Sequence, residues 1–519
     1  MGLQKNKKGQ EIDWVLTIGP LLLIIVISTV LFLFPNQSGH AIEFLRSIFV
    51  GEFGSFYMIF GLGVFLVSIW LAFSRFGNVK LGNLEKPRFN TFSWGAMIFT
   101  STMAADILYW SLIEWAYYFG ANPFGIENPS LAQKQDFASS YPLFHWGPIP
   151  WSFYLLPAVA YGYMIFVKNR KRQTLSEACR STIGSRADGV LGKAIDIFSI
   201  VGLLAGTATT FSLATPLLSL TVSSTLGIPQ SNVLTIIILV IIALVYTVAV
   251  TVGLKGISQL AKICVGIFIT LIAVFLIFGP TKFIIESGVT GIGKLINDFF
   301  SMSTWMDPLR VSGEGGSGFP QDWTVFYWAY WIAWFVATPF FIGKISEGRT
   351  IKQTIVGGFT AGLLGTFTSF IVFGNFGLYQ QTHGKVDASG MLASGASPSE
   401  VIIQIFNQLP ISGVALGLLA LAMIAFYAST FDALTLVVSE YSLKKLEAGQ
   451  EPPKYIRVFW ALIFIILPIA LIFNETTLTM LQTISIVAAF PLAIIMGIVI
   501  YSFLKDISRD TGTGSSSQD

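Results

Sequence analysis

Residues 322–334 have the sequence DWTVFYWAYWIAW, and this run of aromatic side chains lies inside an apolar segment long enough to cross a membrane. Tryptophan and tyrosine in membrane helices usually gather at the two water interfaces rather than in the middle of the helix. Rings in mid-helix are better suited to line a ligand site, and stacked π-faces attract a quaternary ammonium, which donates no conventional hydrogen bond. A second group of rings, Trp146, Trp151 and Tyr154, could supply the other walls of such a site.

Composition places the chain in a membrane. Of its 519 residues, 53% are hydrophobic and only 11% are charged, whereas a soluble domain averages about a quarter charged residues. The sequence therefore predicts an all-α polytopic membrane protein, with the lipid bilayer as its solvent. A net charge of +3 is too small to indicate a nucleic-acid partner, and the two cysteines, Cys179 and Cys264, suggest no disulfide.

Twelve apolar runs of spanning length can be placed along the chain. They lie at about 14–35, 53–73, 92–119, 147–167, 195–222, 232–252, 258–279, 323–346, 352–377, 410–437, 456–474 and 483–504. A stretch near 286–301 is too polar to span, and we expect it to form an amphipathic helix along the membrane surface. The third and eighth spans each begin a block of five, which permits a five-plus-five inverted repeat preceded by two extra helices.

The basic residues indicate the orientation. With the N-terminus inside, 25 of the 31 Lys and Arg residues fall on cytoplasmic segments, as the positive-inside rule requires. Both termini are then cytoplasmic, and the basic start MGLQKNKKGQ is a retained tail rather than a removed signal peptide. The expected organisation is a cytoplasmic tail (1–13), two N-terminal helices (14–91), the first repeat (92–279), an extracellular loop with the surface helix (280–322), the second repeat (323–504) and a cytoplasmic tail (505–519).

Four short stretches resemble the betaine/choline/carnitine transporter family. The segment 322–331, DWTVFYWAYW, is similar to the family's Asp/Gly-Trp-Thr-x-x-Tyr-Trp-x-Trp-Trp signature, with Tyr330 where the first of the paired tryptophans is usual. The sequence ISEGRT at 345–350 looks like the family's Ile-Ser-Arg-Gly-Arg-Thr. FHWGPIPW at 144–151 and YWSLIE at 109–114 look like the branch that exchanges carnitine for γ-butyrobetaine.

The resemblance implies a LeuT-like core in spans three to twelve and a homotrimer in the cytoplasmic membrane. It also implies an ammonium cage made by Trp146, Trp151, Tyr154 and Trp331, with further aromatic positions at Trp334 and Tyr117. Helix geometry independently supports such a cage. Trp151 and Tyr154 are three residues apart, as are Trp331 and Trp334, so the rings of each pair lie on one helix face. At roughly 0.5–2 kcal/mol per desolvated ring, three or four rings would give micromolar binding.

Asp106 in the third span bears on the choice of substrate. A carboxylate at membrane depth is costly and normally faces a cavity or a partner. It would favour a net cation such as choline and repel carnitine or glycine betaine, which carry their own carboxylate. A carboxylate bonded to backbone at a helix break remains an alternative. Because FTSTMAAD at 99–106 lacks the glycines of betaine-binding relatives, the extent to which this helix unwinds is left open.

A coupling ion is a second expectation. Sodium requires hard oxygen ligands such as broken-helix carbonyls and paired hydroxyls. The resemblance places these at Thr100, Met103, Phe426, Ser429 and Thr430, whereas sodium-independent exchangers of the family lack the hydroxyl pair and have an arginine near the position of Cys264. Proton coupling through Asp106 and exchange without sodium are the alternatives. No other cofactor is expected.

Other classes of protein fit less well. The chain has three histidines, no His-Glu-x-x-His sequence and no nucleophile–base pair, so the sequence does not indicate an enzyme. A channel would need repeated polar rings along a pore, but the polar residues are concentrated on two or three helices. A transporter of the same fold for another amine or an amino acid is the nearest alternative to a carrier of quaternary ammonium compounds.

Overall fold

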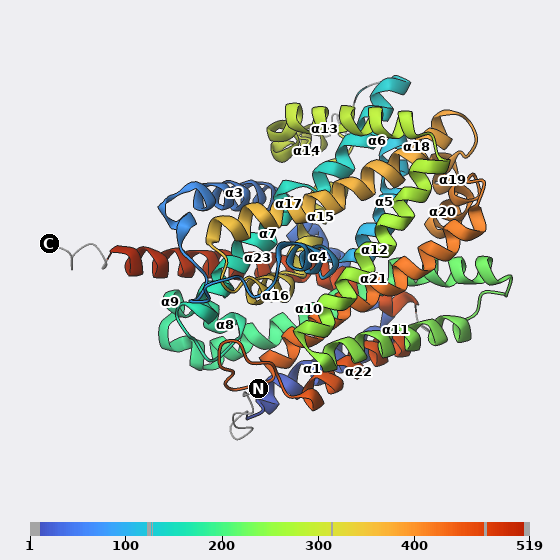
Figure 1. The fold of residues 1–519 in the computed structure, drawn as a ribbon. Helices are drawn as coiled ribbons and strands as arrows, with labels where there is room; N and C mark the ends of the chain where they lie inside the picture. Colours follow the sequence, from blue (N-terminus) through green and yellow to red (C-terminus); the bar gives the residue numbers. More distant parts are fainter. Residues whose placement is uncertain (1–10, 122–125, 127, 313–314, 472–474, 513–519) are drawn as a thin grey trace.

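The computed structural model describes residues 11–121, 126, 128–312, 315–471 and 475–512, and within them the regular elements are helices. Figure 1 shows long helices crossing one another in a single bundle, with shorter helices on the connections. Residues 1–10 and 513–519 of the expected tails lie outside the described residues, whereas residues 505–512, expected to belong to the C-terminal tail, continue the last helix, which ends at Gly512.

The longer helices, in chain order, are α1 (Trp14–Leu33), α2 (Pro35–Arg46), α3 (Gly54–Phe73), α4 (Thr91–Thr100), α5 (Ala104–Gly120), α6 (Leu131–His145), α7 (Pro148–Phe166), α10 (Val190–Leu226), α11 (Asn232–Val252), α12 (Leu254–Phe278), α13 (Thr281–Thr304), α15 (Phe326–Ala333), α16 (Thr338–Ile345), α17 (Ile351–Ser369), α18 (Asn375–Thr382), α20 (Pro398–Phe406), α21 (Ser412–Tyr441), α22 (Lys454–Leu471) and α23 (Glu475–Gly512).

The described residues contain nine helices long and apolar enough to cross a membrane, or eleven if each of two bent pairs counts as one span. These eleven coincide with eleven of the twelve predicted runs. The run at 456–474 corresponds to α22, and its end lies outside the described residues. The amphipathic stretch forms α13, which is not among the candidate spans and packs across α6 (Figure 1).

The third predicted span is broken although it contains no glycine at the break. α4 ends at Thr100, α5 begins at Ala104, and the two axes differ by 65°. The hydroxyls of Ser101 and Thr102 donate to the carbonyl of Ile98 at 3.3 and 2.8 Å, and such local bonds compete with helical hydrogen bonding. Met103 then adopts a left-handed conformation, with φ of +42°, which starts α5 in a new direction.

The eighth predicted span is also broken. A π-helical turn over Pro320–Val325 leads into α15, and residues 334–337 form turns before α16 begins, with a bend of 55° between the two halves. Pro339 near the start of α16 has no N–H to donate to a continuing helix. The breaks therefore fall on the first helix of each predicted block of five, which is where transporters with inverted repeats commonly place their discontinuous helices.

Candidate functional site

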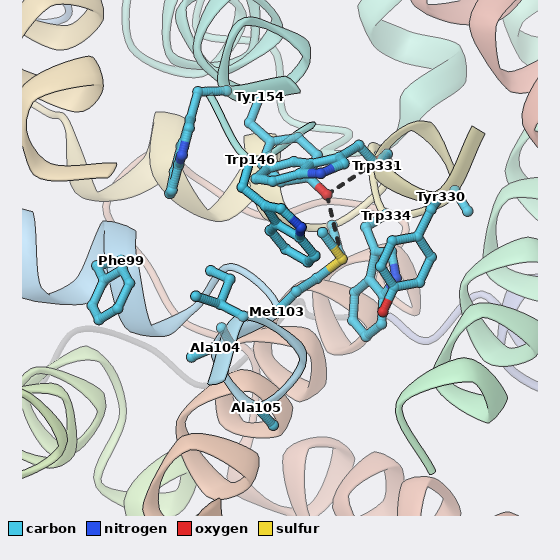
Figure 2. Packing of buried hydrophobic residues seen from close by; sticks show 14 of the residues in the cluster. Phe99, Met103, Ala104, Ala105, Trp146, Tyr154, Tyr330, Trp331 and Trp334 are labelled. Carbon is cyan, nitrogen blue, oxygen red and sulfur yellow. Dashed lines mark hydrogen bonds between the residues drawn. The ribbon is translucent and has the colours of Figure 1, made fainter. Parts of the chain in front are cut away.

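Trp331 is the centre of a buried cluster of aromatic rings. Its ring centroid lies 5.4 Å from that of Trp146, 5.6 Å from that of Trp151 and 5.0 Å from that of Tyr154. The four side chains are fully buried, and Figure 2 shows three of them converging beside the broken segment at Met103. The two tryptophans meet Trp331 at 63° and 62°, so the structure brings the predicted cage residues together around the Trp331 ring.

Local sequence explains how α6 and α7 deliver their rings. α6 ends at His145, Trp146 caps it, and Gly147 and Pro148 turn the chain into α7. Trp151 follows on the first turn of α7 and packs on α17, where a Cβ added at Gly362 would lie only 2.5 Å from the indole. A glycine at position 362 is therefore required to make room for the Trp151 ring.

Tyr154 connects the aromatic cluster to both broken helices. Its hydroxyl donates to the carbonyl of Trp331 at 3.0 Å and lies 3.9 Å from the sulfur of Met103 (Figure 2). The indole N–H groups of Trp151, Trp331 and Trp334 have no hydrogen-bond partner among the residues that the structure describes. Each of these indoles therefore has a buried donor that no described residue satisfies, in addition to its π-face.

Asp106 lies on the first turn of α5 and is fully buried. One carboxylate oxygen, Oδ2, accepts a hydrogen bond of 2.7 Å from the hydroxyl of Thr210 on α10, and Oδ1 has no partner among the described residues. The phenols of Tyr154 and Tyr330 both interact electrostatically with this carboxylate. Asp106 therefore lies beside the aromatic cluster and next to the Tyr330 phenol, and its hydrogen-bond donor is the side chain of Thr210 rather than the backbone.

The two remaining predicted aromatic residues differ in position. Trp334 caps α15, is fully buried and follows Tyr330 by four residues, and the two rings lie close together in Figure 2. Tyr117 is only partly buried, and its ring contacts Trp323 at 5.2 Å and Trp110 at 6.5 Å instead of the rings around Trp331. The structure thus places Tyr117 in a separate aromatic group, which meets the rings around Trp331 through Tyr327.

The predicted ion ligands meet where α4 ends against α21. The Ser429 hydroxyl donates to the Thr100 hydroxyl at 2.8 Å, and the Thr430 hydroxyl lies 3.4 Å from the Thr100 carbonyl. Met103 and Phe426 are on the same two segments, but the Met103 carbonyl already accepts from the Ile107 amide at 2.9 Å. Three of the five predicted residues are therefore in mutual contact.

Oxygen ligands of this kind suit a hard monovalent cation. Among the described residues, no group of three or more His, Cys, Asp or Glu side chains could hold a metal ion. The thiol of Cys264 on α12 donates to the carbonyl of Ala425 at 3.2 Å, one turn before Ser429 on α21. A small neutral side chain therefore lies near the hydroxyl pair, where the sodium-independent exchangers are expected to have an arginine.

Some residues around the cage were not expected from the sequence. The sequence does not assign Tyr327, Tyr330, Thr210 or Glu114 to the site. The departure at Tyr330 from the family's paired tryptophans was the one visible signal for that residue. Glu114 in fact accepts the indole N–H of Trp146 at 2.7 Å.

Comparison with known proteins identifies the family. Residues 15–512 match the model of the betaine/carnitine/choline family of transporters. The chain is 30% identical to a carnitine transporter of Acinetobacter baumannii over 500 residues, which cover 94% of this chain and 89% of that protein. It is 28% identical to a probable glycine betaine transporter of Desulfitobacterium hafniense over 520 residues, covering 98% and 99% of the two chains.

The match extends over nearly the whole sequence and includes every residue of the aromatic cluster. Together with the apolar helices, it excludes an enzyme and makes the protein a multi-pass membrane transporter of quaternary ammonium compounds. The chain belongs to the betaine/carnitine/choline transporter family.

Proposed function

We propose that this protein is a secondary transporter that moves a quaternary ammonium compound across the cytoplasmic membrane by alternating access, with its substrate held by Trp146, Trp151, Tyr154 and Trp331. The observation that carries the proposal is the packing of three rings around Trp331 between the two broken helices. Discontinuous helices near the bilayer midplane are where such transporters bind their substrates. Rings offer a methylated nitrogen both quadrupole attraction and dispersion.

The proposal extends to the arrangement in the membrane. Twelve spans, two of them preceding a five-plus-five inverted repeat, put both termini on the cytoplasmic side, which agrees with the distribution of basic residues. We propose a homotrimer as the assembly, which mass measurement in detergent would test.

We favour choline as the substrate because of Asp106. A carboxylate with one oxygen bonded to Thr210 and the other without a partner among the described residues would stabilise a substrate that carries a net positive charge. Carnitine and glycine betaine would bring a second carboxylate into the same buried site. They remain the second candidates, since the two relatives named above are a carnitine transporter and a probable glycine betaine transporter.

We also propose sodium as the coupling ion, held between Thr100, Ser429 and Thr430 with carbonyl oxygens of Met103 and Phe426. The contacts that support this are the two hydroxyls directed at the last residue of α4. Proton coupling through Asp106, and sodium-independent exchange of carnitine for γ-butyrobetaine, are the alternatives.

Uptake into proteoliposomes tests the substrate and the coupling together. Radiolabelled choline, carnitine and glycine betaine would be compared under an inward sodium gradient, under a proton gradient, and with each compound loaded inside as counter-substrate. We expect saturable choline uptake that the sodium gradient stimulates. Uptake that requires internal carnitine and does not change with the sodium gradient would establish the exchanger instead.

Asp106→Asn isolates the contribution of the charge, because asparagine has nearly the same size and shape. We expect choline binding to weaken by about tenfold, the equivalent of about 1.4 kcal/mol, while binding of glycine betaine is unchanged or improves. Thr210→Val is the matched control, since it removes the hydrogen bond to Asp106 but leaves the carboxylate. Equal effects of Asp106→Asn on both compounds would remove the reason for favouring choline.

A further inference from the structure

A buried carboxylate lies directly behind one wall of the cage. Glu114 on α5 is fully buried and accepts hydrogen bonds of 2.7 Å from the hydroxyl of Tyr118, the indole N–H of Trp146 and the hydroxyl of Tyr327. These donors come from α5, from the turn between α6 and α7, and from α15. The indole N–H can only donate, and both phenols are placed to donate to Glu114, so the three contacts fit the ionised carboxylate, which has no hydrogen of its own to place.

The neighbouring histidine completes the network without a positive charge. Nδ1 of His145 lies 2.8 Å from the Tyr118 hydroxyl and 3.4 Å from Oε1 of Glu114, and Nε2 lies 3.0 Å from the hydroxyl of Thr324. Since the Tyr118 hydrogen goes to Glu114, its oxygen accepts from Nδ1–H, and Thr324 can donate to Nε2; this tautomer is assigned from the network. Every group is then satisfied by a neutral imidazole, which leaves one negative charge in the network, on Glu114.

That charge acts on the cage through a single bond. The Glu114 carboxylate holds the indole N–H of Trp146, and the Trp146 ring meets Trp331 at 5.4 Å. A hydrogen bond to an anion polarises its donor, so the face of the Trp146 ring becomes more negative. A cation in the cage gains from the ring quadrupole and from the carboxylate behind it. A neutral molecule of the same shape gains only dispersion.

We propose that Glu114 is a specificity-determining positioning residue, which fixes the Trp146 indole through its N–H and makes the aromatic cage prefer a cation over a neutral ligand of the same shape. The inference rests on the proposed function, because it takes Trp146 to be a wall of the substrate cage.

The test compares two ligands that differ only in charge. Choline and 3,3-dimethylbutan-1-ol have the same shape, with a carbon in place of nitrogen in the second. Binding of each to the purified full-length protein would be followed by intrinsic tryptophan fluorescence. We expect Glu114→Gln, which keeps the size and one acceptor oxygen, to weaken choline binding by about tenfold while binding of the neutral alcohol changes by less than about twofold.

Two further variants separate charge from packing. In a Trp146→Phe background, which lacks the indole N–H, Glu114→Gln should have a much smaller effect on choline, as expected for coupled groups. Tyr118→Phe removes a different donor to Glu114 and keeps the charge, so it should leave the preference for choline over the alcohol unchanged. If Glu114→Gln does not fold, Trp146→Phe alone must still lower that preference.

The binding data separate failure of the proposed aromatic recognition from failure of the proposed role of Glu114. If the wild-type protein bound both ligands equally, the proposed aromatic recognition of a quaternary ammonium would fail. If the wild type preferred choline and Glu114→Gln weakened both ligands equally, or neither, Glu114 would have no role in selecting the charge. An unchanged preference in Trp146→Phe would likewise overturn the inference.

Discussion

At both broken helices a backbone carbonyl near the break accepts a hydrogen bond from another helix, but the donor side chains differ. At the first break the Thr100 carbonyl accepts a hydrogen bond of 3.4 Å from the hydroxyl of Thr430 on α21. At the second, the Trp331 carbonyl accepts one of 3.0 Å from the hydroxyl of Tyr154 on α7. At the first break a second hydroxyl, that of Ser429, contacts the Thr100 side chain. At the second, the hydroxyl belongs to a phenol whose ring is itself part of the aromatic cluster.

Under the proposed function, this difference lets one fold hold two kinds of cation. Clustered hydroxyl and carbonyl oxygens suit a small hard ion, whereas ring faces suit a large soft one that cannot donate hydrogen bonds. The conformations differ as well. The first break contains left-handed Met103, while residues 334–337 of the second have no positive φ. The first break is therefore the more strained of the two.

The largest effect on transport is expected when the two hydroxyl side chains that face the first break are removed. Replacing both Ser429 and Thr430 by Ala should abolish sodium stimulation of uptake in proteoliposomes, because it removes both side-chain oxygens that face Thr100. Ser439→Ala is a matched control, since the Ser439 hydroxyl on the same helix bonds only to its own turn, at the Thr435 carbonyl. Sodium stimulation that survives in the double variant would contradict the assignment.

Removing the central ring of the second break should have the next largest effect. Trp331→Leu should weaken choline binding at least tenfold, or about 1.4 kcal/mol. The substitution removes one π-face and the ring against which the three other aromatic side chains pack. Trp328→Leu provides the comparison, since Trp328 is equally buried on α15 but packs against Phe144 and Phe153. Equal losses of affinity in both variants would indicate general damage to α15 rather than a cage.

A smaller effect should follow from removing only the phenol hydroxyl at the second break. Tyr154→Phe keeps the ring beside Trp331 and leaves the Trp331 carbonyl with its bond from the Trp334 amide. The loss of about 1 kcal/mol for one buried hydrogen bond corresponds to roughly fivefold weaker choline binding, if that bond holds the two helices in the binding geometry. Affinity equal to that of the wild type would show that the ring alone suffices.

The smallest effect should come from the strain at the first break. Met103→Val places a β-branched residue at a φ of +42°, whereas Met103→Gly allows that conformation freely. Both variants lose the contact with Tyr154, so their comparison isolates the backbone. We expect thermal unfolding of the purified protein to occur a few degrees lower for the valine variant than for the glycine variant. Identical unfolding midpoints would mean that the backbone at residue 103 is not strained.

Sequence reasoning recovered the features that are local in the chain. Spans follow from hydropathy, and the density of rings at 322–334 pointed to the helix that carries Trp331. It left open whether the third span unwinds, because the expected glycines are absent. In the structure the helix breaks there, where Met103 adopts a left-handed conformation and the two axes differ by 65°. It also separates Tyr117 from the cage, a placement that depends on Trp323 more than 200 residues away in sequence.

The sequence by itself determined that the chain lies in a membrane, which family it belongs to, and which side chains are available to bind a cation, because these depend on composition and short-range order. Only the tertiary structure decided which of those side chains meet. The partners of Asp106, Trp146 and Thr100 are Thr210, Glu114 and Ser429, and none of the three pairs shares a helix. In lipid each buried polar group must find its partner within the protein, so these long-range pairings are set by how the helices pack.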